Sequence, residues 1–163
     1  MSFIAHVRKN GDTPQMLHEH LRNVGAMAGA NAAKIRLGMQ GELIGLLHDL
    51  GKYSQAFQNY LKSAVGLLNQ DEDEDYVDAA RLKGRIDHST AGAQLIWFEL
   101  SKQGGLGCLV GQVLSLCIAS HHSGLIDCIA PDGEDTFGKR MSKRSDRTSL
   151  DEAVAAVFAP EET

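Results

Sequence analysis

The sequence predicts an all-α fold, a compact helical bundle of about six or more helices. Three observations predict it. Apolar residues recur at helical spacing in each long segment, no segment alternates polar and apolar residues over the length of a strand, and capping residues flank the periodic segments. At 163 residues, 43% of them hydrophobic, the chain is long enough for a single domain over residues 1–163 with a core of its own.

Two helices are expected in the first third of the chain. Thr13 can cap the first one, with Pro14 at the first helical position, where a missing N–H does no harm. The apolar stripe of the first helix consists of Leu17, Leu21, Val24, Ala28 and Ile35, and that of the second consists of Leu43, Leu46, Leu47 and Leu50. We expect the second helix to stop at Gly51.

The middle of the chain predicts two more helices, separated by a loop. The third helix should run from Ser54 to about Leu68. The acidic block 71–75 should form a solvated or disordered loop, because five like charges in a row repel one another. Asp87 can cap a fourth helix over residues 88–102, whose Trp97, Phe98 and Leu100 are expected in the core.

The last third predicts a central helix and a terminal one. Residues 106–122 are apolar nearly all round, which is typical of a helix at the centre of a bundle, and Cys117 should be a small buried residue within it. Ser123 and Gly124 should end it. A capping box of Ser149 and Glu152 predicts the terminal helix, with Pro160 beyond its end.

Composition narrows the class of protein. No run of 18 apolar residues occurs, so no membrane span is expected. The three cysteines are odd in number and never spaced as C-x-x-C, which favours neither a disulfide framework nor a zinc knuckle. A reducing cytoplasm fits this usage best.

The charge distribution leaves nucleic-acid binding open. The formal net charge of −5 argues mildly against a dedicated nucleic-acid binder. Yet one short basic run is spaced like one face of a helix and could neutralise DNA phosphates. It consists of Lys139, Arg140, Lys143, Arg144 and Arg147. A solvated surface is the alternative interpretation of these residues.

Histidines and one aspartate mark the candidate site. Burying His48 and Asp49 at the end of an apolar helix costs several kcal/mol unless each group finds a partner. Five of the seven histidines lie at or near ends of apolar helices: His20, His48, His88, His121 and His122. Imidazole and carboxylate groups from facing helices hold divalent metals such as Mn, Fe, Co, Ni or Zn. The alternative interpretation is that these histidines are ordinary core or surface residues, but it requires a separate explanation for each of the five.

Several motifs carry a family resemblance. "LLHDLGK" matches the H-D-x-G-K signature of the HD superfamily of metal-dependent phosphohydrolases, and "LHEHLRNVGAMA" resembles the helix of its first histidine, here His20. More narrowly, "DHSTAGA" and "ASHHSGLIDCIAPDGEDTF" are similar to the CRISPR-associated HD nuclease domain that works with the type I interference helicase. "AHV" at His6 and "GKYSQAFQNYL" also fit, so the resemblance spans about residues 5–140.

The resemblance implies a role for each motif residue. His20, His48 and Asp49 would hold one metal, and Asp49 would bridge to a second metal. His88, His121 and His122 would complete the coordination of that second metal. One or two divalent ions would then activate water against a phosphodiester, with Asp49 and Lys52 as catalytic residues. The implied substrate is single-stranded DNA. The implied partners are a helicase domain in cis or trans and the CRISPR surveillance complex.

One family feature is missing. The family's last metal ligand is an aspartate on a later helix, and nothing in this chain matches that setting. Asp146 and Asp151 are the nearest candidates. We therefore expect the chain to be the N-terminal portion of a longer, helicase-fused protein. Two alternatives remain: an HD phosphohydrolase for a nucleotide or cyclic dinucleotide, and a catalytically incomplete docking domain.

Two further histidines have weaker predictions. His18 lies two residues from His20, about 200° round a helix, so both cannot point inward and His18 should be exposed. His6 matches the family but precedes any clear helix, and its role is left open.

Overall fold

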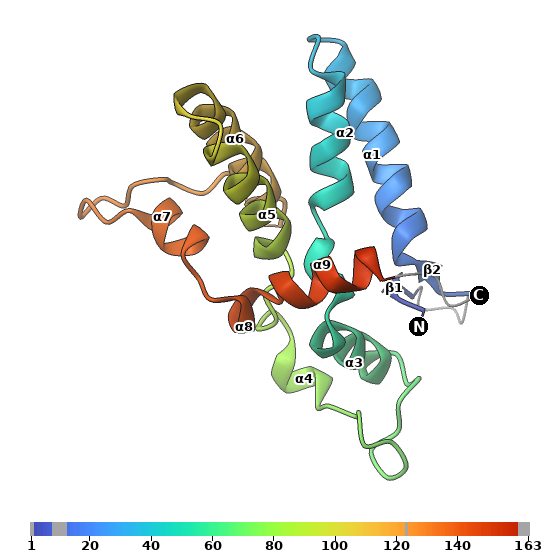
Figure 1. Cartoon of the computed structure of the whole chain (residues 1–163). Helices are drawn as coiled ribbons and strands as arrows, with labels where there is room; N and C mark the ends of the chain where they lie inside the picture. The colour runs from blue at the N-terminus through green and yellow to red at the C-terminus, as the bar shows by residue number, and fades with distance from the viewer. Residues whose placement is uncertain (1, 8–12, 123, 160–163) are drawn as a thin grey trace.

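The computed structural model describes residues 2–7, 13–122 and 124–159 (Figure 1). Within these residues the chain forms nine α-helices, one short 3-10 helix (η1) and one two-stranded sheet. The prediction of a mostly helical bundle is confirmed. No helix among the described residues is both long enough and apolar enough to cross a membrane.

Two helical hairpins form the upper part of the molecule in Figure 1. One consists of α1 (Leu17–Ala33) and α2 (Gly38–Leu47), and the other of α5 (Thr90–Ser101) and α6 (Gly105–Ala119). The first hairpin packs backbone against backbone, because a Cβ at Gly45 would lie 2.6 Å from the Cα of Gly25. Glycine at both positions therefore sets how closely the two helices approach.

The lower part holds the short elements that follow the first hairpin. These are η1 (Leu50–Tyr53), α3 (Gln55–Ala64) and α4 (Ala79–Leu82). The small antiparallel sheet pairs β1 (Ile4–His6) with β2 (Gln15–Met16). The buried Gln58 of α3 joins these parts, because its side chain accepts from Ile4 N and donates to the carbonyls of Ile4 and Lys52.

Three helices follow the second hairpin: α7 (Thr136–Met141), α8 (Ser145–Thr148) and α9 (Leu150–Phe158). In Figure 1, α9 crosses the molecule below the two hairpins. It packs on η1 and α5 through the fully buried Ala153. Glu152 Oε1 accepts a hydrogen bond from Gln55 N at 2.7 Å, so α9 also caps the start of α3.

The main core lies between α5, α6 and α7. Its buried members are Ala93, Ile96, Leu114, Ile118, Ala119, Phe137 and Met141, and Leu43, Ile44 and Leu47 of α2 pack against it. A second, smaller cluster joins Ala5, Leu17 and Leu21 beneath the small sheet. The site described below lies at the end of α2 and draws residues from α1, which carries part of the second cluster, and from the ends of α5 and α6, which carry the first.

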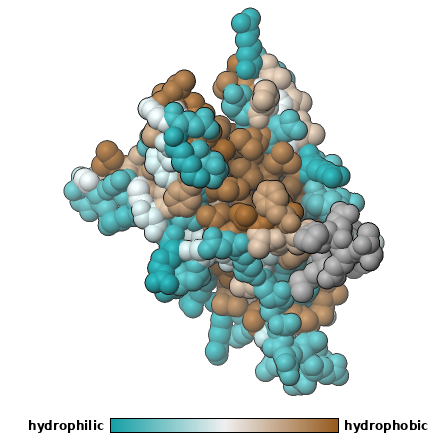
Figure 2. Space-filling view, viewed as in Figure 1, coloured by the Kyte–Doolittle hydropathy of each residue, from teal (hydrophilic) through white to brown (hydrophobic). Residues whose placement is uncertain are grey.

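The prediction that the apolar helix is central was wrong. One side of α6 faces solvent, with Leu106, Leu109 and Val113 each more than half exposed, and Cys117 is exposed as well. Phe98, expected in the core, is 40% exposed. Figure 2 shows hydrophobic residues gathered between α6 and the first hairpin. Periodicity could not reveal this, because an all-apolar sequence does not indicate which side has a partner.

Several predicted helix ends also need correction. Thr13 and Pro14 precede strand β2, and the first helix begins at Leu17, with Met16 at the N-cap position and no side-chain cap. Ile35, expected on its apolar stripe, lies beyond its end at Ala33 and is 69% exposed. Ser149 has a left-handed backbone (φ 57°) and makes no side-chain cap, so the proposed capping box with Glu152 does not form. A capping box is a local sequence pattern, whereas in the fold the Glu152 side chain caps the start of a distant helix, α3.

The remaining boundaries differ less. The second helix ends at Leu47, and the expected stop at Gly51 falls inside η1. The third helix is capped at its start by Ser54, whose Oγ accepts a hydrogen bond from Phe57 N. It ends at Ala64 rather than near Leu68. The acidic block forms an exposed loop, as expected. Ser123 and Pro160, expected beyond two helix ends, lie outside the described residues.

Candidate metal centre

Six polar side chains from four parts of the chain converge at the end of α2. His20 comes from α1, His48 and Asp49 from the junction of α2 and η1, His88 from the approach to α5, and His121 and His122 from the end of α6. They form two groups that share Asp49, and the ligand atoms within each group lie within 4.8 Å of one another. Residues up to 102 positions apart therefore meet in one cluster.

The first group surrounds one oxygen of the Asp49 carboxylate. Oδ2 lies 3.3 Å from His20 Nε2, 3.1 Å from His48 Nε2 and 2.9 Å from Lys52 Nζ. The two imidazole nitrogens are 3.3 Å apart. All four residues are at most partly exposed, and the side chain of Asp49 is only 4% exposed.

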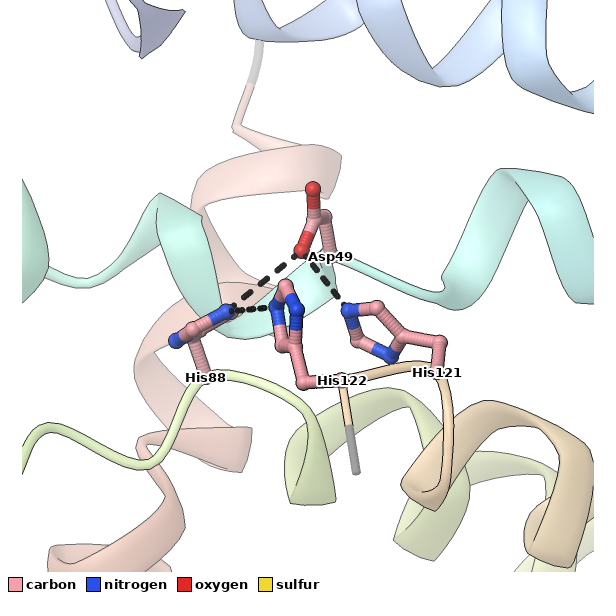
Figure 3. A group of neighbouring side chains, drawn as sticks. All are labelled: Asp49, His88, His121 and His122. Atoms are coloured by element: carbon pink, nitrogen blue, oxygen red, sulfur yellow. Dashed lines mark hydrogen bonds and ion pairs between the residues drawn. The ribbon is translucent and has the colours of Figure 1, made fainter. Parts of the chain in front are cut away.

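The second group surrounds the other carboxylate oxygen (Figure 3). Oδ1 lies 3.4 Å from His121 Nε2 and 3.7 Å from His88 Nε2. His88 Nε2 in turn lies 2.7 Å from His122 Nε2. Figure 3 shows the three rings around the same side of Asp49, and His122 lies between the other two in that view.

The two oxygens of Asp49 therefore face two different sets of imidazoles. Asp49 Oδ1 makes no hydrogen bond, and it is the one buried side-chain oxygen or nitrogen in the described part of the chain that has no such partner. An unpaired buried carboxylate oxygen costs several kcal/mol unless a cation pairs with it. This orphaned oxygen, facing imidazole nitrogens, fits a metal ligand.

The imidazole rings are oriented by their own backbone. Nδ1 of His48 lies 2.8 Å from Gly45 O, Nδ1 of His121 lies 2.7 Å from Ile118 O, and Nδ1 of His88 lies 3.3 Å from Ile86 O. A ring that donates its Nδ1–H to a carbonyl presents a bare Nε2 lone pair. Hydrogen bonds of this kind fix the tautomer of metal-binding histidines. The local turns thus direct three Nε2 atoms at Asp49.

Close pairs of imidazole nitrogens also fit a cation. When both rings are neutral and donate through Nδ1, two lone pairs face each other across the gap. A proton or a metal ion between them relieves the repulsion. The separations of 2.7 Å (His88–His122) and 3.3 Å (His20–His48) are short enough to matter. Mixed nitrogen and oxygen donors suit divalent transition metals.

Electrostatics keep most of the cluster in the state that binds cations. Burial lowers the pKa of His20 and of His122, and it lowers the pKa of His88 to about 4, so these rings are neutral at pH 7. Burial alone would raise the pKa of Asp49, but the neighbouring His121, His48 and Lys52 hold it far below the usual range. The carboxylate is therefore ionised.

His48 differs from the other rings. Burial opposes its protonation, but the hydrogen bond to Asp49 and the attraction of the carboxylate charge outweigh this and raise the pKa of His48 above its usual value. In the absence of another cation, the Lys52 ammonium balances the charge of Asp49, and the carboxylate favours protonation of His48. A divalent ion would take over that balance.

Comparison with known proteins agrees with this geometry. The model of a protein family, described as the HD domain of Cas3, matches residues 6–162, nearly the whole chain. The chain belongs to the Cas3 HD-domain family. This membership implies a CRISPR-associated, metal-dependent nuclease, and the family's use of divalent metals fits the His/Asp cluster. None of the curated proteins compared matches the chain.

Two histidines of this Cas3 HD domain lie at the edge of the site or outside it. His18 is exposed, as predicted from its position on the helix. His6 is exposed too, but its ring packs edge-on against the ring of His20, with centroids 5.6 Å apart. His6 therefore lies beside the first group without belonging to either set of ligand atoms.

The basic run does not form the predicted helix face. It is divided between α7, α8 and the turn between them. Arg140 bonds to Ser89 and Thr90, and Lys143 bonds to Asp87. The pairs Lys139–Glu134 and Arg144–Asp146 lie at the surface. Substrate contact by Lys139, Arg140, Lys143 and Arg144 stays a prediction.

The late aspartate of the family has no counterpart among the described residues. Asp146 is exposed and pairs with Arg144, and Asp151 is exposed on the first turn of α9. Neither belongs to the two ligand groups. The first group thus consists of His20, His48 and Asp49 in this part of the chain.

Sequence analysis missed one contact of the second group. The ring of Phe57 lies 4.9 Å from the ring of His88, and Lys52 Nζ lies 5.4 Å from the centroid of Phe57. Phe57 is buried, so an apolar ring packs against one ligand of the second group and lies near Lys52. An apolar residue at helical spacing indicates only a core position, so sequence offered no sign of this packing.

Proposed function

We propose that this chain hydrolyses phosphodiester bonds of single-stranded DNA in type I CRISPR interference. The observation that carries the proposal is the Asp49 carboxylate, whose two oxygens face two separate sets of imidazole nitrogens. Such a carboxylate suits a bridge between two cations. Membership of the Cas3 HD-domain family supports the reaction class.

We further propose the ligand sets. His20, His48 and Asp49 would hold one divalent ion, and Asp49, His88, His121 and His122 a second. When bound, such ions lower the pKa of water and stabilise negative charge on phosphoryl oxygens. The chain's own contribution is to fix the rings through carbonyl hydrogen bonds and to keep Asp49 ionised in a buried position.

Lys52 is proposed to act on the substrate. Its ammonium lies 2.9 Å from Asp49 Oδ2 and 3.4 Å from Ala5 O, and its side chain is 12% exposed. Once a metal pairs with Asp49, the ammonium is no longer required there to balance the carboxylate. Lys52 can then offset charge that builds up on the phosphoryl oxygens in the transition state.

The proposed setting follows from the family alone. The chain would act in the cytoplasm beside a helicase, either fused to it or as a separate subunit. The CRISPR surveillance complex would deliver the strand to be cut. A domain that receives DNA opened by a helicase needs no large basic surface of its own, which agrees with the net charge of −5.

Two classes of substrate distinguish the proposed DNA nuclease from the alternative, an HD phosphohydrolase for a nucleotide or cyclic dinucleotide. The purified chain is incubated with circular single-stranded DNA, and in parallel with nucleotides and cyclic dinucleotides, each with Mn, Co, Ni or Fe. We expect metal-dependent linearisation and degradation of the circle, abolished by chelator and by Asp49→Ala. Hydrolysis of the small molecules with the circle left intact would favour the nucleotide phosphohydrolase instead.

One observation favours a second candidate, a catalytically incomplete docking domain. The family's late aspartate has no counterpart in either ligand group of the described residues. This function predicts bound metal, measured by elemental analysis, with no turnover of DNA or nucleotides under any of the four metals. Turnover that is lost in Asp49→Ala would rule it out.

A further inference from the structure

The basic side chains of the α7 region contact the turn that carries His88. Arg140 Nε donates to Thr90 Oγ1 at 2.9 Å, and Arg140 Nη2 donates to Ser89 Oγ at 2.8 Å. Lys143 Nζ donates to Asp87 Oδ2 at 2.7 Å. Both cations therefore act across 50 or more residues of sequence on residues that lie within two positions of His88.

These contacts form a closed network around the start of α5. Asp87 Oδ1 accepts from Thr90 N at 3.0 Å, and Asp87 Oδ2 accepts from both Thr90 Oγ1 and Lys143 Nζ at 2.7 Å. Thr90 is fully buried and Ser89 is 9% exposed. We call Asp87, Ser89, Thr90, Arg140 and Lys143 the His88 brace. Four of its five hydrogen bonds are partly buried, and the Lys143–Asp87 bond is exposed. Together they link both flanks of His88 to the end of α7, which restricts the shape of the turn.

The brace is itself fixed to the fold. The buried Gln94 of α5 donates to the carbonyls of Met141 and Lys143, at 2.9 and 2.7 Å, and accepts from Thr148 Oγ1 at 2.7 Å. The end of α7 is thus tied to α5 one turn beyond Thr90. Arg140 and Lys143 therefore emerge from backbone that cannot slide along α5.

His88 is held from the opposite side by the Asp49 segment. Gly51 N donates to His88 O at 3.2 Å, so the backbone of His88 lies directly against η1. The brace and this hydrogen bond together set the distance from His88 Nε2 to Asp49 Oδ1, now 3.7 Å. Without the brace, the backbone of His88 would keep the Gly51 bond, and its ring would keep the Nδ1 contact to Ile86 and the packing against Phe57 and His122, but nothing would fix the turn on both sides of it.

We propose that Arg140 and Lys143 are positioning residues for His88 and act through the Asp87–Thr90 turn. This inference rests on the proposed function, in which His88 is a metal ligand. It gives the two cations a role different from the phosphate contact predicted from the sequence. Groups that support metal ligands in this way contribute about 10–100-fold to metal affinity.

Neighbouring residues offer matched controls. Lys139 lies on the same helix as Arg140 and pairs with the surface residue Glu134. Arg144 follows Lys143 and pairs with the exposed Asp146. Both pairs lie at the surface, so the variants Lys139→Ala and Arg144→Ala each remove a positive charge without releasing the brace.

The test is Mn²⁺ binding to the full chain without DNA, measured by calorimetry and by the electron paramagnetic resonance of free Mn²⁺. We expect Arg140→Ala and Lys143→Ala to weaken one of two binding events about tenfold or more, and the control variants Lys139→Ala and Arg144→Ala to leave both unchanged. Unaltered Mn²⁺ binding in Arg140→Ala, together with weaker binding of single-stranded DNA, would overturn the inference in favour of phosphate contact.

Two further variants distinguish positioning from general stability. Lys143→Arg keeps the charge near Asp87 and should restore most of the affinity lost in Lys143→Ala. In a His88→Ala background, Arg140→Ala should cause no further loss of Mn²⁺ affinity, because the residue through which it acts is gone. An equal loss with and without His88 means that Arg140 acts through overall stability, and the inference is then wrong.

The same titration separates this inference from the proposed function. If the unaltered chain binds no Mn²⁺, the proposed metal centre fails, and the positioning role fails with it. If the unaltered chain binds two ions and the Arg140 and Lys143 variants do so equally well, only the positioning role fails.

Discussion

Substitution of Gly51 by alanine tests how closely the two ligand groups must approach. Gly51 is the glycine of the "HDLGK" motif and is buried against the segment before α5. A Cβ added there would lie 2.5 Å from His88 O and 2.7 Å from His88 Cα. These are backbone atoms, which cannot rotate away as the end of a flexible side chain can.

The size of the effect follows from that contact. An ordinary van der Waals separation begins at 3.4 Å, so the backbones of Gly51 and His88 must move apart by about 0.9 Å. The Gly51 N–His88 O bond lengthens, and His88 Nε2 moves away from Asp49 Oδ1. Forcing a methyl group into packed space costs about 1–3 kcal/mol. A misplacement of this size near reacting groups can lower the rate about 10²-fold.

The assay combines thermal unfolding, Mn²⁺ titration and DNA cleavage. For a chain of this length, a loss of 1–3 kcal/mol lowers the melting temperature by about 2–4 °C for each kcal/mol. We expect weaker binding of the ion held by His88 and slower cleavage. The control is Gly105→Ala, since a Cβ at Gly105 meets nothing within 4 Å and alanine favours the first turn of α6.

Gly105→Ala should leave metal binding and cleavage unchanged and the melting temperature equal or higher. If Gly51→Ala kept the melting temperature, metal affinity and cleavage rate of the unaltered chain, the two backbones would not be in the contact described. The reasoning that links Gly51 to the position of His88 would then be refuted.

Other substitutions test individual roles. Asp49→Ala should lose both metal ions and all cleavage while circular dichroism shows nearly unchanged helix content; cleavage at the normal rate would mean that Asp49 is not the bridge. Lys52→Ala should keep its metal, by elemental analysis, but cut DNA about 10²-fold more slowly; loss of metal instead contradicts the role given to Lys52. His18→Ala should change metal content little, unlike His20→Ala, and a large drop would show the wrong histidine was chosen. Saturating Mn²⁺ at 100 times its Kd should stabilise the chain by about 2.7 kcal/mol, reversed by chelator; an unchanged melting temperature would argue against a folded metal site.

The sequence by itself determined the class of fold and the types of residue at the site. Helical spacing of apolar residues is a local property, so it located the long helices, including the start of α3 beside Ser54. Asp87 Oδ1 accepts from Thr90 N at the start of α5, although the helix begins at Thr90, two residues later than predicted, with Ser89 at its N-cap position. The "HDLGK" motif and the family resemblance identified the six residues that the structure brings together, because ligand chemistry restricts which side chains can serve.

Only the tertiary structure decided which groups act as partners. Glu152 caps α3 rather than its own helix, and Arg140 binds a turn 51 residues away instead of facing solvent. The exposed side of α6 was equally invisible in the sequence. The family resemblance implied that Asp49 bridges two sets of imidazoles, but only the structure assigned each carboxylate oxygen to its own set. The physical reason is that burial, pairing and orientation depend on distant segments. A local pattern specifies what a side chain can do, whereas packing specifies which neighbour it meets.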